Sequence, residues 1–139
     1  MNATITAVQF VSPLPGLGAH TSFTLDRIDG AEGLFALRST RGDVRLFVID
    51  PASAGYGLAD EGGYRPSLTA GVRAQVGATD ASEVRLFVVA NPAEDGVFLN
   101  LRAPILIHRD TGRAAQVILD DQAYPIRALL GRTAGTPVA

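Results

Sequence analysis

Apolar residues in this chain gather in short runs, and each run ends at residues that favour turns. The runs occupy residues 5–11, 22–28, 33–39, 44–50, 83–91, 97–101 and 105–107. Short strands at regular spacing, with Gly, Pro, Asp or Ser between them, favour a sandwich or a small barrel. The sequence therefore predicts an all-β, single-domain, antiparallel β-barrel-like fold with about 8–10 short strands. We expect the domain to occupy residues 1–130 and residues 131–139 to form a flexible tail.

Two stretches depart from the strand pattern. Residues 51–66 are rich in Gly, Ala, Pro and acidic residues, which predicts a surface loop. In residues 67–77 the apolar side chains recur every four positions, so they share one face of a short helix. Ser67 is the expected N-cap of this helix and Gly77 its expected stop. A last ordered element is expected at 123–130.

The region that follows Asn100 has the pattern of a hairpin. Residues 105–107 and 117–119 favour strands, and the Asp-Thr-Gly sequence at 110–112 supplies the reversal between them. Pro104 has no N–H for a sheet ladder, so we expect it at a strand start or on an edge. Asn100 lies between two leucines, which predicts a hydrogen bond to neighbouring backbone or a contact with a partner.

One hexapeptide occurs twice with a single change. Val84-Arg-Leu-Phe-Val-Val89 repeats Val44-Arg-Leu-Phe-Val-Ile49. The flanking sequences do not match, and a repeat protein shows a sustained period. We therefore favour two core strands with the same β-favouring sequence over a duplicated unit. Apolar residues on both faces of each copy predict strands buried on two sides, as in a closed or strongly curved sheet.

The sequence lacks recognisable catalytic and metal-binding motifs. There is no cysteine, and the only histidines are His20 and His108. Neither histidine lies in a nucleophile-elbow context, and no residues have metal-ligand spacing. We expect His108 to be a solvated residue at the hairpin tip, and we expect no cofactor, no metal and no enzymatic activity. A hydrolase with an unfamiliar site around His108 is the alternative within the enzyme class.

Charge and hydropathy limit the kinds of partner. The chain has 139 residues, a net charge of −2 and no Trp. Nucleic-acid binders normally have a basic surface and stacking aromatics, so direct nucleic-acid binding is not expected. No apolar run approaches the ~20 residues of a membrane span, and the N-terminus lacks the signal-peptide pattern. We therefore expect a cytoplasmic protein that does not associate with membranes.

A rigid turn near the N-terminus contains two leucines. The segment Pro13-Leu-Pro-Gly-Leu-Gly18 has no following helix pattern and no Lys-Ser/Thr, so it is not a phosphate loop. Leu14 and Leu17 either pack on the end of the barrel or are exposed contacts for a partner.

Five ordered blocks of the sequence resemble the flagellar assembly factor FliW family. They are Phe10-x-x-Pro-Leu-Pro-Gly-Leu17, Leu34-Phe-Ala-Leu-Arg-Ser39, Leu46-Phe-Val-Ile-Asp-Pro51, Asn100-Leu-x-Ala-Pro-Ile105, and Gln116-Val-Ile-Leu119 with Tyr124. Their order and spacing agree with the family over residues 5–128. Arg102 departs from the pattern, because an apolar residue is frequent at that position in the family.

The resemblance implies a compact barrel-like protein without enzymatic activity. FliW-like proteins bind newly made flagellin and also the small RNA-binding repressor CsrA, whose repression of flagellin mRNA they antagonise. Flagellin that accumulates in the cytoplasm would occupy the factor, free the repressor and stop its own synthesis. Such a circuit needs only two partners that bind the same protein in a mutually exclusive way.

The candidate partner-binding residues follow from these motifs and from the resemblance. They are Asn100, Arg102, Pro104, Gln116, Leu14 and Leu17. Asn100, Arg102 and Pro104 form a junction of polar and apolar groups, and we expect Gln116 near it across the hairpin. The alternative is that Asn100 and Pro104 only shape the barrel. We expect Asn100→Ala to leave folding cooperative and to weaken partner binding.

The alternative function is a small-ligand-binding β-barrel of unrelated role. It requires a deep apolar pocket with a few convergent polar groups.

Overall fold

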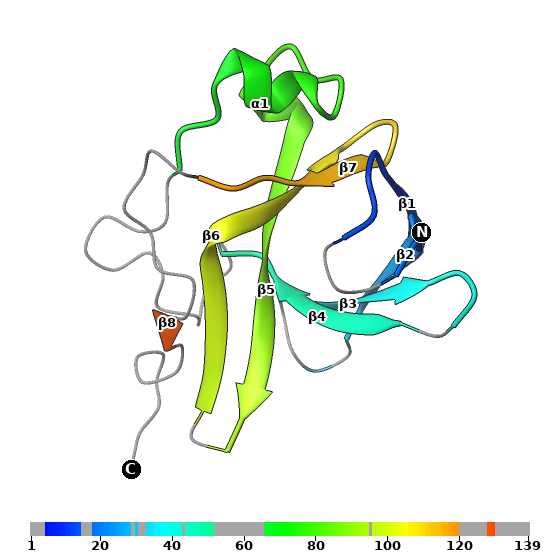
Figure 1. Ribbon diagram of the computed structural model, residues 1–139, viewed down its shortest axis with the longest axis vertical. Coiled ribbons are helices and arrows are strands. Elements are labelled where there is room, and N and C mark those ends of the chain that lie inside the picture. The colour runs from blue at the N-terminus through cyan, green and yellow to red at the C-terminus, as the bar shows by residue number, and fades with distance from the viewer. Residues whose placement is uncertain are drawn as a thin grey trace.

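Seven strands of the described chain close into a barrel (Figure 1). The computed structural model describes residues 5–14, 18–28, 30, 33–42, 44–51, 66–94, 96–119 and 128–129. The barrel strands are β1 Ile5–Phe10, β2 Ser22–Arg27, β3 Leu34–Ser39, β4 Arg45–Ile49, β5 Val84–Ala93, β6 Gly96–His108 and β7 Arg113–Gln116. Each strand pairs antiparallel with the next, and the predicted all-β barrel is confirmed. The ring is closed by a short parallel pairing of β7 with β1, which the sequence did not indicate. A further strand, β8 Ala128–Leu129, pairs with β6.

Both faces of β4 and β5 are buried, as the repeated hexapeptide predicted. Val48 and Phe87 belong to a cluster that draws on all seven barrel strands and therefore fills the interior. The residues that follow them, Ile49 and Val88, belong to a separate buried cluster with residues of β6. This division follows from strand geometry, because successive side chains point to opposite faces of a sheet. The two copies of the hexapeptide lie on neighbouring antiparallel strands.

The predicted short helix is present as α1 Ala70–Ala74, which lies at one end of the long β5–β6 pair (Figure 1). It is shorter than the expected span of 67–77. Thr69, not Ser67, is the N-cap, because its hydroxyl accepts a hydrogen bond from the Val72 N–H at 3.3 Å. The helix ends at Ala74, three residues before its expected stop at Gly77, where φ is +77°. The apolar side chains of this segment pack against a third buried cluster, which includes residues of β6. A 3₁₀ helix at Ala81–Glu83 leads into β5.

The hairpin after Asn100 differs from the prediction in its strand boundaries. β6 is one strand of 13 residues, although the sequence indicated separate runs at 97–101 and 105–107. The return strand β7 begins earlier than the predicted run at 117–119, and the latter residues continue beside β6 through backbone hydrogen bonds. Gly112 makes the reversal, as predicted, with φ of +78°. A Cβ at Gly112 would collide with the Ala7 carbonyl oxygen, so the closure of the barrel requires glycine here.

Several expectations lie outside the described residues. They concern the loop at 52–65, Leu17, most of the element at 123–130 and the tail at 131–139. Within the described part of the chain, no helix is long and apolar enough to cross a membrane.

Candidate functional site

β6 leaves its regular ladder with β5 immediately after Asn100. Asn100 lies opposite Val89 and Ile105 opposite Phe87, so one β5 residue faces the four β6 residues 101–104. The extra residues form a bulge. The fully buried Pro104 lies in this bulge, and the expectation of a strand start or an edge was wrong. A bulge tolerates proline because it interrupts the ladder that would require its N–H.

The side chain of Asn100 closes the bulge. Its Oδ1 accepts hydrogen bonds from the backbone N–H groups of Arg102 and Ala103, each at 3.1 Å. From β7, Gln116 Nε2 donates to the Ala103 carbonyl at 3.0 Å. The predicted hydrogen bond of Asn100 to neighbouring backbone is thus confirmed, and Gln116 lies across the hairpin as expected. Asn100 shapes the barrel, while its role in partner binding stays a prediction.

A hollow of about 310 Å³ opens beside the bulge. Its described lining consists of Leu14, Arg45, Leu46, Val89, Asn91, Asn100, Ile105 and Gln116. Three predicted site residues, Leu14, Asn100 and Gln116, therefore meet there although they are far apart in sequence. Arg102 and Pro104 are not among the lining residues. Leu14 is only 5% exposed and packs with the interior cluster, so it is not an exposed contact. Leu14 is buried because its apolar side chain packs against the other apolar side chains that fill the barrel.

The hollow combines an apolar wall with polar groups at its margin. Leu46, Val89 and Ile105 supply apolar surface, and the exposed Asn91 and Arg45 add an amide and a guanidinium. Amides both donate and accept hydrogen bonds, whereas a guanidinium only donates. Such a mixture can accommodate an apolar side chain while hydrogen-bonding the backbone on either side of it.

No sequence pattern marks Arg45, Leu46, Val89 and Asn91 as members of this site. They belong to β4 and β5, and the antiparallel pairing of β4 with β5 and of β5 with β6 brings them beside the bulge.

His108 is buried, contrary to the prediction of a solvated residue at the hairpin tip. It ends β6 with 7% exposure, and its Nδ1 accepts hydrogen bonds from the N–H groups of Asp110 at 3.1 Å and Thr111 at 3.4 Å. These bonds explain the burial, since the imidazole satisfies the backbone of the turn. Its Nε2 lies 3.5 Å from Glu83 Oε1. Hydrogen bonds from Thr79 and the proximity of His108 hold the pKa of the Glu83 carboxyl below its usual value.

The contacts of His108 order the turn between β6 and β7. Among the described residues, no group of three or more His, Cys, Asp or Glu side chains is placed to hold a metal ion.

Comparison with known proteins identifies the family. The family model described as "FliW protein" matches residues 2–130. The chain belongs to the FliW family. The flagellar assembly factor FliW of an Exiguobacterium species is 31% identical over 128 residues, which cover 91% of this chain and 84% of the relative. The factor from Symbiobacterium thermophilum is 39% identical over 66 residues, covering 46% of this chain and 48% of that protein.

A solved structure supports the same fold. The crystal structure of the flagellar assembly factor FliW superimposes with a TM-score of 0.75 at 24% identity, covering 88% of this chain and 84% of that one. The seven-stranded barrel with one short helix is therefore the fold of the FliW family.

Proposed function

We propose that this FliW protein binds flagellin and antagonises a CsrA-type RNA-binding repressor in the cytoplasm, coupling flagellin synthesis to secretion. Membership of the flagellar assembly factor family supports the proposal. The observation that carries it is the convergence of Leu14, Asn100 and Gln116 on the hollow beside the β6 bulge. The action is binding, with no chemical step.

The hollow suits a peptide segment of flagellin. An apolar side chain of that segment packs against Leu46, Val89 and Ile105. The amides of Asn91 and Gln116 then bond the backbone of the segment, and Arg45 pairs with an acceptor beside it. The CsrA-type repressor binds in a way that excludes flagellin, because a partner switch requires mutually exclusive occupancy.

Calorimetric titration of the purified protein tests the proposal. Flagellin and the CsrA-type repressor of the same organism are titrated separately and then in competition. We expect both to bind, and each to weaken the other. No heat of binding with either partner, from protein shown to be folded by circular dichroism, would contradict the proposal.

Two exposed residues at the margin test the hollow as the flagellin site. Asn91→Ala and Arg45→Gln remove polar contacts there, and we expect each to weaken flagellin binding about tenfold. Arg27→Gln removes an exposed charge from β2, outside the hollow, and should leave binding unchanged. Equal affinities in all three variants would place the flagellin site elsewhere.

The hollow also supports the second candidate, a small-ligand-binding barrel. Its volume of about 310 Å³ lies at the low end of the range for small-molecule sites, and its apolar wall has a few polar groups at the margin. A thermal-shift screen with small apolar amides distinguishes the two functions. The ligand barrel is favoured if a small molecule raises the unfolding temperature of the native protein but not that of Asn91→Ala. The native protein must also show no binding of flagellin.

A further inference from the structure

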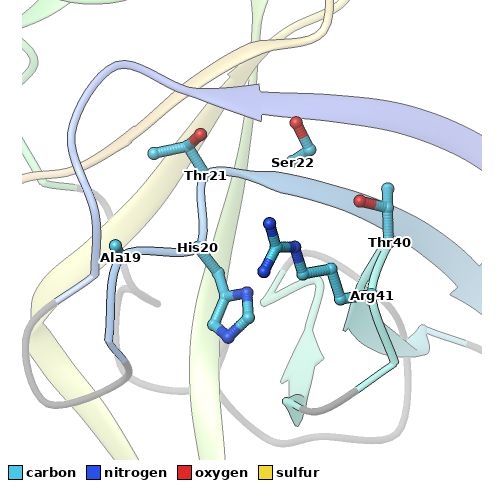
Figure 2. A pocket seen from close by; sticks show the side chains of 6 residues that line it. All are labelled: Ala19, His20, Thr21, Ser22, Thr40 and Arg41. Atoms are coloured by element: carbon cyan, nitrogen blue, oxygen red, sulfur yellow. The ribbon is translucent and has the colours of Figure 1, made fainter.

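A second hollow, of about 370 Å³, lies between the segment that enters β2 and the turn that joins β3 to β4 (Figure 2). Its described lining consists of Ala19, His20, Thr21, Ser22, Thr40 and Arg41. Every lining side chain except that of Ala19 is polar. The hollow shares no described residue with the one beside the β6 bulge, so it is separate from the surface proposed for flagellin.

Arg41 contributes a guanidinium to this second hollow. Figure 2 shows the side chains of Arg41, from the turn after β3, and of His20, from the segment before β2, at this hollow. The described lining contains no Asp or Glu. On the same sheet, Asp26 pairs with Arg38, not with Arg41. Because a guanidinium has five N–H donors and no acceptor, Arg41 presents hydrogen-bond donors that no carboxylate of the described lining occupies.

Hydroxyl groups on a hydrogen-bonded backbone complete the lining. Thr21 Oγ1 accepts a hydrogen bond from Gln9 Nε2 at 3.0 Å, which leaves the threonine O–H available to donate. The Thr40 N–H donates to the Ser22 carbonyl at 3.0 Å, and the Phe10 N–H donates to the Thr21 carbonyl at 2.8 Å. The first bond joins the two segments that line the hollow, and the second ties the segment before β2 to β1, so the backbone that carries Thr21 and Thr40 is held in place.

We infer that this hollow binds the phosphate group of a small molecule, with Arg41 as its principal anchor. The planar guanidinium pairs with two phosphate oxygens at once, and the hydroxyls of Thr21 and Thr40 supply further donors. The hollow is within the range of about 300–1,000 Å³ typical of small-molecule sites, so a phosphate ester fits as well as free phosphate. The inference is independent of flagellin and repressor binding.

Amide chemical shifts of ¹⁵N-labelled protein provide the test. Inorganic phosphate, adenosine monophosphate and sodium chloride are titrated at matched ionic strength. We expect saturable shifts with both phosphates, centred on residues 19–22 and 40–42, and no saturable shift with chloride. Tighter binding of the nucleotide identifies a phosphate ester as the ligand class, whereas equal affinities identify the phosphate group alone.

Two arginine variants separate specific binding from general charge effects. Arg41→Gln should weaken phosphate binding about tenfold or more, because it removes a charge-assisted pair of hydrogen bonds. Arg27→Gln removes the same charge from an exposed position on β2 and should bind as the native protein does. The spectra also report whether each variant is folded. Shifts that never saturate, shifts centred elsewhere, or equal losses in both variants would overturn the inference.

Discussion

Replacement of Asn100 by alanine tests whether the bulge in β6 depends on one side-chain oxygen. Asn100 Oδ1 accepts the N–H groups of Arg102 and Ala103 at 3.1 Å each, and the alanine variant leaves both donors without this acceptor. A buried donor that loses its partner costs about 1–3 kcal/mol. Because Asn100, Arg102 and Ala103 are only half-buried, water can replace part of the loss. We therefore expect a destabilisation of about 1–2 kcal/mol in total.

Urea denaturation measures this effect. With a denaturant slope of about 1–3 kcal/mol per molar, the unfolding midpoint should fall by on the order of 1 M while the slope stays constant. Asn100→Asp is the matched control, because it keeps the acceptor oxygen and removes only the amide N–H groups. At neutral pH we expect this variant to retain most of the native stability.

Two results would refute the reasoning. One is an alanine variant within about 0.5 kcal/mol of the native protein, which is the range of ordinary surface substitutions. The other is an equal loss in Asn100→Ala and Asn100→Asp, which would assign the effect to the amide N–H groups. Cooperative unfolding of the alanine variant is still expected, so its partner affinity must be compared at equal folded fraction.

Three further substitutions test other parts of the barrel. Gly112→Ala should lose about 2 kcal/mol or more in urea denaturation, because φ of +78° strains a residue with a Cβ and that Cβ meets a β1 carbonyl. Gly30→Ala, at φ of +82° in open space, should lose only the strain, and equal losses would contradict the close approach. Arg85→Ala should lose about 1–2 kcal/mol by the same assay, because its guanidinium lies 4.7 and 5.4 Å from two phenylalanine rings. A loss no larger than that of the more exposed Arg45→Ala, which removes a single ring contact, would count against this packing. The pKa of Glu83 lies below its usual 4.5, so its stabilisation is present above that pH and disappears as the pH falls through the folded-state value. Glu83→Gln should therefore be less stable than the native protein at neutral pH, and the difference should shrink as the pH falls below 4.5; a difference that stays constant as the pH falls would contradict the assignment.

The strands were predictable from sequence wherever apolar runs and turn residues agreed. The boundaries of β1 to β4 lie within one residue of the predicted runs, because local alternation and turn chemistry decide them. β6 was not predictable as one strand, since Asn100 and Pro104 interrupt its apolar pattern. Only the pairing with β5 and β7 on either side makes the interruption a bulge within a continuous strand.

The candidate site was predictable only in part, because pairing between strands, which local sequence patterns do not show, brings some of its residues together. Asn100 and Gln116 stood out because each is a polar residue in an apolar context. Arg45 and Asn91 carry no such local signal, and their place beside the bulge follows from the pairing of β4 with β5 and of β5 with β6.

The contrast between residues that stand out in the sequence and residues that strand pairing brings to the site affects how the binding site should be mapped. The residue that is most conspicuous in the sequence, Asn100, also holds the bulge together, so its replacement changes stability and the hollow at once. A loss of flagellin binding in Asn100→Ala therefore cannot separate contact from folding. Asn91 and Arg45 are exposed at the margin of the same hollow, and no hydrogen bond from either side chain supports the bulge among the described residues. A loss of binding at these two positions would consequently report contact with the partner, although sequence alone would not have selected them.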